Sequence, residues 1–219
     1  MDDEMVLHLR TDNSILAEFR ENGVVQTKFI TADALFESIR GSTHIPAIHT
    51  GLLPPNILSV RVGSDDIRYA VVEWMGEKAD ITYASTVYTG FPLPRLLFGF
   101  YVTSNGRISH VDLGVPALGK LSPDTPMFFY PLSNVMRFSL CTGSNPLPHI
   151  KDLRGLQNLP DYILSLPDND DRFSESNNQM KLGHRDLMEH LQDKNRQYYY
   201  EHVLVPMPQT TLKNFLQEE

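Results

Sequence analysis

The sequence predicts an α+β fold: a four-stranded antiparallel meander with flanking helices and an N-terminal β-rich extension. The strongest signal lies at residues 96–113, where two alternating apolar segments flank Ser104-Asn105-Gly106. Asn-Gly between such segments is typical of a tight β-hairpin, because both residues tolerate the positive φ angles of the turn. Short β-rich runs bounded by turn residues recur before and after this hairpin, whereas amphipathic helix patterns are few.

Length and composition limit the class of protein. The 219 residues suffice for one sizeable core with an appended subdomain. A net charge of −8 argues against a nucleic-acid-binding surface. A single cysteine, Cys141, excludes an internal disulfide and a cysteine-based zinc site, and it is typical of a cytosolic protein. The acidic start and the lack of a long apolar run predict no signal peptide, no membrane span and a cytoplasmic location.

The first 56 residues are predicted to form a β-β-β-α subdomain and a loop. Residues 5–9, 15–19 and 24–30 have the composition of strands, and Asp12-Asn13-Ser14 and Asn22-Gly23 have that of turns. We therefore expect a small antiparallel sheet at the start of the chain.

A helix is expected to follow these strands. Thr31 is a suitable N-cap, Asp33 lies in the first turn, where the helix dipole favours an acidic residue, and Gly41 is expected to end the helix. In the loop beyond it, His44 and His49 have no carboxylate or cysteine close by in sequence. We therefore expect no metal site there.

Residues 57–219 are predicted to form the core domain, with helices mostly after the strands. The predicted strands are residues 58–62, 67–74, 81–88, 96–103, 107–113 and 127–130. The predicted helices are residues 161–164, residues 182–194 and a last short helix that Thr210 or Thr211 caps.

Residues 128–149 hold the strongest candidate for chemistry. One apolar run ends at Pro131, a second covers residues 135–140 and leads to Cys141, and a Gly/Asn/Pro-rich loop follows. A thiol at the end of a strand, with the amide of Asn134 upstream, suits attack on a carbonyl. That chemistry needs an accessible sulfur and a donor for the developing oxyanion. The alternative is that Cys141 is a small buried apolar residue.

The order of these residues resembles the active-site segment of ubiquitin-conjugating enzymes. Tyr130-Pro131-x-x-Asn134-Val135 followed by Leu140-Cys141 is similar to the His-Pro-Asn turn, short strand and acceptor cysteine of that family. The chain most resembles the bacterial branch called prokaryotic family D, which includes PRTRC system protein B. Further stretches that fit this branch are Leu52-Leu53-Pro54-Pro55, Phe91-Pro92-Leu93-Pro94, residues 125–130, and Leu204-Val205-Pro206 with Thr211-Leu212.

The chain departs from the family pattern at three points. Tyr130 replaces the histidine, two extra residues separate Pro131 from Asn134, and Thr142 replaces the apolar residue that usually follows the cysteine. These departures leave open whether Asn134 takes the place of the family's asparagine.

The resemblance implies a ubiquitin-conjugating fold and a transferase activity. Cys141 is then expected to accept a bacterial ubiquitin-like modifier as a thioester and to pass it to a target. Asn134 is expected to donate a hydrogen bond to the oxyanion, and His149 to accept a proton or to orient the loop. The residues expected to contact the partner protein are Tyr130, Pro131 and Pro146.

The resemblance also implies the partners of this reaction. The sequence has no phosphate-binding glycine loop, so a separate ThiF-like adenylating enzyme is expected to activate the modifier. We expect no cofactor, no metal, no nucleic acid and no membrane among the partners.

Two other functions are open. A conjugating fold could persist as a catalytically inactive binding platform, encoded in a bacterial mobile-element or defence operon. A cysteine hydrolase would need a histidine beside the thiol, and His184, His190 and His202 are available downstream although none lies in a recognisable signature.

Acidic residues follow the cysteine at a distance that also suits the resembled family. Asp168, Asp170 and Asp171 could form an acidic gate that desolvates and deprotonates an incoming amine. A solvated acidic loop is the expectation we favour.

Overall fold

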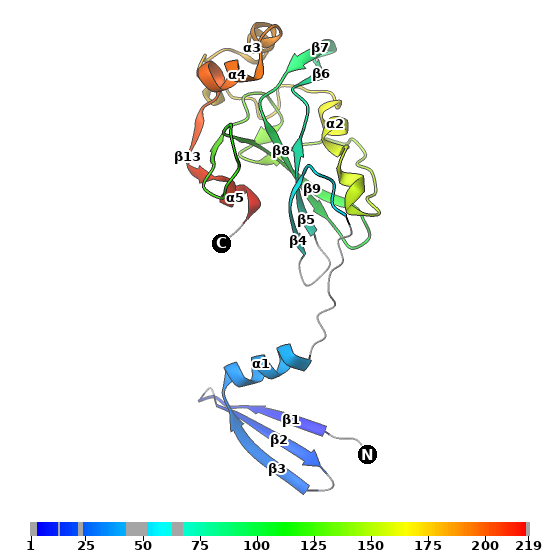
Figure 1. Cartoon of the computed structure of the whole chain (residues 1–219), viewed down its shortest axis with the longest axis vertical. Coiled ribbons are helices and arrows are strands. Elements are labelled where there is room, and N and C mark those ends of the chain that lie inside the picture. Colours follow the sequence, from blue (N-terminus) through cyan, green and yellow to red (C-terminus); the bar gives the residue numbers. More distant parts are fainter. Residues whose placement is uncertain (1–3, 13, 22–23, 43–51, 63–67, 218–219) are drawn as a thin grey trace. The chain divides into compact units, whose positions relative to one another are not determined.

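The computed structural model describes residues 4–12, 14–21, 24–42, 52–62 and 68–217 (Figure 1). The chain divides into two compact units, Met1–His49 and Thr50–Glu219. The sequence-based boundary lies a few residues later, between residues 56 and 57.

The first unit contains a three-stranded antiparallel sheet and a helix. Strands β1 (Glu4–Leu9), β2 (Ile15–Glu21) and β3 (Val24–Ile30) pair in the order of the sequence, and α1 (Ala32–Ser42) follows. The hydroxyl of Thr31 accepts a hydrogen bond of 3.2 Å from the backbone N–H of Ala34, as an N-cap does. The predicted strands and helix cap are confirmed. The predicted turn residues Asn13, Asn22 and Gly23 lie outside the described residues.

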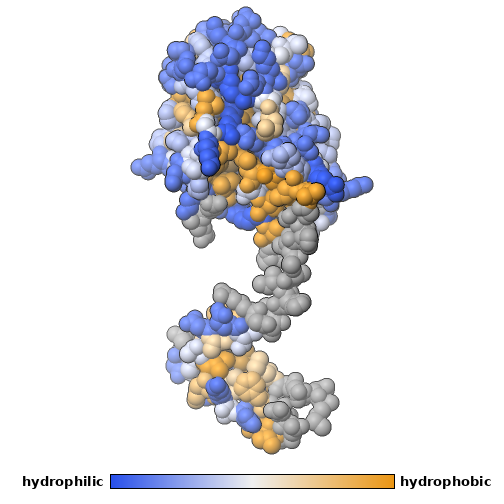
Figure 2. Space-filling model, in the orientation of Figure 1, coloured by the Kyte–Doolittle hydropathy of each residue, from blue (hydrophilic) through white to orange (hydrophobic). Residues whose placement is uncertain are grey.

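The first unit buries little apolar surface. Ile15 and Ala17 are its buried apolar residues among those described, whereas Phe29 and Phe36 are 62% and 61% exposed. Figure 2 shows apolar side chains on the surface of this unit. A 49-residue unit with so small a core gains little stability from burial.

The second unit is built on a large antiparallel sheet. In spatial order, its main path consists of β11 (Val135–Met136), β12 (Ser139–Leu140), β9 (Ile108–Pro116), β8 (Leu96–Val102), β5 (Arg68–Trp74) and β4 (Ile57–Val62). Two further strands, β10 (Pro126–Phe128) and β13 (Pro206–Thr211), extend it from the end of β9. The fold is therefore α+β, with mostly antiparallel strands and few helices.

The central hairpin of this sheet is the one that the sequence predicts. Strands β8 and β9 pair along their length, and the turn between them contains Gly106 at φ +80°. A Cβ at Gly106 would lie 2.3 Å from the carbonyl oxygen of Ile150, so glycine is required both for the backbone angle and for the space. Strand β10 lies beside β9 as expected, although it ends at Phe128 and not at Tyr130.

Alternation along the strands divides the core between the two faces of the sheet. In β5, Ala70 and Val72 face one apolar cluster and Tyr69 and Val71 face another. The larger cluster includes residues of α2 (Leu159–Leu164) and α3 (His184–Leu191), and the smaller one residues of β13 and α5 (Leu212–Leu216) (Figure 1). Burial of each large apolar side chain contributes about 1.5–3 kcal/mol to such a core.

Three expectations for this unit need correction. Residues 81–88 are not one strand: β6 (Lys78–Tyr83) and β7 (Thr86–Pro92) form a two-stranded sheet that turns at Ala84 and Ser85, which both have positive φ. The predicted helix over 182–194 is limited to α3, which ends at Leu191, and Asn195 caps a separate helical segment. The run 135–140 is the hairpin β11–β12 and not a single strand.

The other elements are short. They are the 3₁₀ turns η1 (Leu153–Leu156) and η2 (Glu175–Asn177), the turn α4 (Arg196–Tyr198) and the π-helical segment η3 (Tyr199–Val203). Within the described ranges, no helix is both long enough and apolar enough to cross a membrane.

Candidate active site

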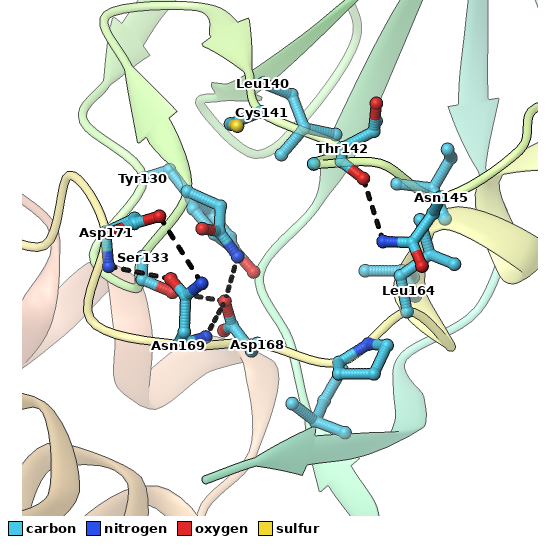
Figure 3. Close-up of a pocket in the computed structure, with 16 residues that line it drawn as sticks. Tyr130, Ser133, Leu140, Cys141, Thr142, Asn145, Leu164, Asp168, Asn169 and Asp171 are labelled. Atoms are coloured by element: carbon cyan, nitrogen blue, oxygen red, sulfur yellow. Dashed lines mark hydrogen bonds between the residues drawn. The ribbon is translucent and has the colours of Figure 1, made fainter.

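A cavity of about 120 Å³ opens beside Cys141, where the hairpin β11–β12 meets the loop that follows α2. Figure 3 shows Asp168, Asn169 and Asp171 along one side of it and Thr142 and Asn145 on the other. The polar lining residues are Tyr130, Ser133, Asn134, Cys141, Thr142, Asn145, Asp168, Asn169 and Asp171. One thiol, several amides and two carboxylates therefore share one small space.

Cys141 lies directly after β12 and is partly exposed to solvent. Its backbone N–H donates a 2.8 Å hydrogen bond to the carbonyl oxygen of Asn134, which closes the hairpin β11–β12. The tight turn of the hairpin is possible because Arg137 adopts a φ of +59°. The thiol is thus accessible after a strand, as expected.

Asn134 lies beside Cys141 and takes a left-handed backbone conformation, with φ +62°. Asparagine tolerates this conformation better than other non-glycine residues. Its backbone N–H donates to the carbonyl oxygen of Asp171 at 2.7 Å, and its side-chain amide donates to Oδ1 of Asp168 at 2.5 Å. The loop after α2 therefore fixes both the backbone and the side chain of Asn134.

Asp168 is the most enclosed carboxylate of the cavity, and its side chain is 13% exposed. Its Oδ1 accepts hydrogen bonds from the Ser133 hydroxyl, from the Asn134 amide and from the backbone N–H of Asn169. Its backbone N–H donates to the carbonyl oxygen of Thr82 in β6 at 2.7 Å. The expectation of a fully solvated acidic loop is therefore wrong for Asp168.

Burial raises the pKa of Asp168, and the hydrogen bond from Ser133 opposes this rise. Nearby, Asp170 has a side chain that is 73% exposed. Hydrogen bonds from Tyr83 and then from His184 lower the pKa of Asp170. The pKa values of these two carboxyl groups, which belong to the same loop, are thus shifted in opposite directions.

His184 lies behind this loop, at the start of α3. Its ring stacks on Phe173 at 4.6 Å between ring centroids, and it contacts the ring of Tyr83. Nδ1 of His184 lies 3.0 Å from Oδ1 of Asp170, and Nε2 lies 4.0 Å from Oδ2 of Asp168. His184 therefore does not line the cavity itself but lies behind Asp168, which does.

The other predicted site residues lie outside the centre of the cavity or below the surface. Tyr130 lines the cavity but is 7% exposed, and Pro131 is buried, so neither offers a broad surface to a partner. Pro146 is exposed and lines a neighbouring groove, where its carbonyl oxygen accepts a hydrogen bond from Tyr162. His149 is exposed and does not line the cavity. His44 and His49 lie outside the described residues.

The sequence did not indicate that Ser133 belongs to the site or that Asp168 and His184 lie close together. Ser133 is one of the two extra residues between Pro131 and Asn134, and it holds Asp168. That insertion is the signal that could have found it. No sequence signal connects His184 to Asp168, because their proximity depends on the packing of Phe173 and Tyr83.

The lining residues determine what the cavity can do chemically. They provide a thiol, amide donors and carboxylates, and none of them is Lys, Arg or His. No group of three or more His, Cys, Asp or Glu side chains in the described ranges is arranged to bind a metal ion. The arrangement suits a nucleophile that attacks an activated carbonyl better than one that needs an adjacent base.

No protein-family model, curated protein or solved structure matches this chain.

Proposed function

We propose that this protein is a ubiquitin-conjugating-like carrier that acts in the cytoplasm. It accepts a bacterial ubiquitin-like modifier as a thioester on Cys141 and passes it to an amine of a target protein. A ThiF-like enzyme supplies the modifier in adenylated form. The observation that carries the proposal is the meeting of a partly exposed thiol, the Asn134 amide and the acidic loop at one cavity.

The two half-reactions fit the groups present. In loading, the Cys141 sulfur attacks the acyl carbon of the adenylate, AMP leaves, and the thiol proton passes to solvent. In transfer, the target amine attacks the thioester carbonyl, the C–S bond breaks, and the Cys141 thiolate leaves. The proton of the amine passes to water or to a carboxylate of the acidic loop, such as Asp171.

The absence of a basic side chain from the lining supports a carrier over a hydrolase. A cysteine hydrolase needs a histidine within reach of the thiol to activate it and to protonate the leaving group. None of the described lining residues is a histidine, and His149 does not line the cavity. A carrier acts on an acyl group that is already activated, so it manages without such a base.

The proposal predicts a thioester at Cys141. When the protein is mixed with a ThiF-like enzyme, ATP and the modifier encoded nearby, a non-reducing gel should show an adduct that reductant removes. Cys141→Ser should form an adduct that resists reductant and is cleaved by hydroxide, and Cys141→Ala should form none. An equal adduct with Cys141→Ala would place the acceptor elsewhere.

Asn134 is expected to act in transfer and not in loading. Asn134→Gly removes the amide and keeps the positive φ angle, so it is a better variant than Asn134→Ala. Loading should be unchanged, and discharge of the isolated thioester to free lysine should slow by about 10²-fold, because an oxyanion donor is lost. Unchanged discharge would exclude this role.

The binding platform is the second function, and the same experiment separates it. The Asn134 amide is already held by Asp168, as in a site kept for structure. If wild type forms no adduct under any of these conditions and still binds the modifier tightly, the protein is a platform and not a carrier.

A further inference from the structure

His184 has an unusual place for a polar residue of this unit. Its side chain is 2% exposed, and its Nε2 has no hydrogen-bond partner among the described residues. A buried polar atom without a partner costs about 1–3 kcal/mol. Oδ2 of Asp168 lies 4.0 Å from this Nε2 atom. The unpartnered nitrogen therefore faces the carboxylate that lines the Cys141 cavity.

The contact between Nδ1 of His184 and Asp170 determines which ring nitrogen always carries a proton. The Asp170 carboxylate accepts from the hydroxyl of Tyr83 at 2.7 Å and lies 3.0 Å from Nδ1 of His184. A carboxylate only accepts, so Nδ1 must donate to it. The variable proton of His184 is then on Nε2, on the side of Asp168.

The two oxygens of Asp168 have different surroundings. Oδ1 accepts from Ser133, Asn134 and the Asn169 backbone, which suits a charged carboxylate. Oδ2 faces Nε2 of His184. An ionised Asp168 can therefore hold the Asn134 amide through Oδ1 while Nε2 of His184 lies on the side of its other oxygen.

We propose that His184 is a positioning residue: through Asp168 it holds the side-chain amide of Asn134 in its place beside Cys141, and protonation of the buried Asp168 regulates transfer. This role in transfer rests on the proposed carrier function, whereas the coupling of the three side chains does not. In this step one proton is exchanged between Asp168 and solvent, so that only the O–H bond of the carboxyl group forms or breaks.

Other charged groups near His184 contribute to this regulation. Asp170 and Tyr83 face one side of the ring, and the guanidinium of Arg185 lies 5.2 Å from the centroid of the Tyr83 ring. Glu175 and Asp186 line the open pocket on the outer side. These are the charged and titratable groups that the described elements around His184 place near its ring.

The coupling is tested by NMR on the full chain without any partner. The side-chain amide signals of Asn134 should shift with pH as Asp168 ionises. In His184→Phe, whose ring keeps the stacking on Phe173, the midpoint of the Asn134 signals should move to higher pH, because the nearby cation that favours ionised Asp168 is lost. His184→Gln should shift it in the same direction. Asn134 signals that do not change with pH in wild type, or an unchanged midpoint in both variants, would overturn the proposal.

The consequence for transfer is tested on the isolated thioester. His184→Phe should load as wild type does and discharge to free lysine about tenfold more slowly, because the donor is less well placed. His190→Gln is the matched control, since His190 lies on the same helix and pairs with Tyr198. Normal discharge by His184→Phe across the pH range would overturn the regulatory role. Absence of loading in wild type would instead refute the carrier function and leave the NMR test intact.

Discussion

Asp168 is the residue on which the site depends most. It is held by side chains from the turn after β10 and by the backbone of β6, so it connects two segments far apart in sequence. Burial raises its pKa above the ordinary value of 3.8. A group whose pKa is raised on folding binds more protons in the folded state, so its ionisation lowers stability as pH rises above the unfolded pKa.

Asp168→Asn should therefore change the pH dependence of stability. Asparagine cannot ionise, and its carbonyl oxygen can still accept from Ser133 and Asn134. The free energy of unfolding of the variant, relative to wild type, should increase between about pH 4 and about pH 8. Urea denaturation measures it, with Asp171→Asn as the control for loss of a carboxylate from the same loop. A constant or decreasing difference would contradict the raised pKa.

Some of the individual residues of the site could be predicted from the sequence. Cys141 was evident as the only thiol, and Asn134 from its position in a turn upstream. The burial of Asp168 was not evident from the sequence, because a run of Asp and Asn has the composition of a solvated loop. The hydrogen bonds that enclose Asp168 come from Ser133, Asn134 and the backbone of Asn169, and Oδ2 of Asp168 faces His184. These contacts depend on the fold and not on local sequence.

Among the elements, the hairpin β8–β9 was predictable because its turn has a strong chemical signal in Asn105-Gly106. The hairpin β6–β7 was not, since its turn uses Ala84 and Ser85 at positive φ, which these residues rarely adopt. The hairpin β11–β12 has a similar turn, with Arg137 at positive φ. The residues at the turns thus explain why the sequence predicted the hairpin β8–β9 and did not predict the hairpins β6–β7 and β11–β12.

Strand β8 contains a glycine that is required for packing. A Cβ at Gly99 would lie 2.2 Å from the hydroxyl oxygen of Tyr69, which is buried within hydrogen-bond distance of Asp112 and of the Phe215 carbonyl. Gly99→Ala should therefore lower the free energy of unfolding by about 1–3 kcal/mol, because the Tyr69 ring must move.

Chemical denaturation of Gly99→Ala measures this loss. Gly155→Ala is the matched control, since a Cβ there meets the Ile150 side chain at an ordinary 3.5 Å, and its effect should stay within about 0.5 kcal/mol. Equal effects of the two substitutions would show that contact with Tyr69 does not constrain β8.

For the whole molecule, most of the buried apolar side chains among the described residues belong to the second unit. Both apolar clusters consist of residues from that unit, and the cavity beside Cys141 is lined by its residues alone. The fragment 50–219 should therefore unfold cooperatively, with a midpoint within about 4 °C of the full chain, because it loses little of the core. Calorimetry measures both midpoints. A fragment that aggregates or unfolds without a cooperative transition would show that the first unit is part of the folding unit.

The central claim is that Cys141 carries the modifier, and the most direct test is to map the attachment site. Cys141→Ser, loaded with the adenylating enzyme, ATP and the modifier, gives an adduct stable enough for digestion and tandem mass spectrometry. The C-terminus of the modifier should be linked through an ester at position 141, and hydroxide should release it. Attachment to lysine side chains, in the same amount with Cys141→Ala, would show that Cys141 does not carry the modifier.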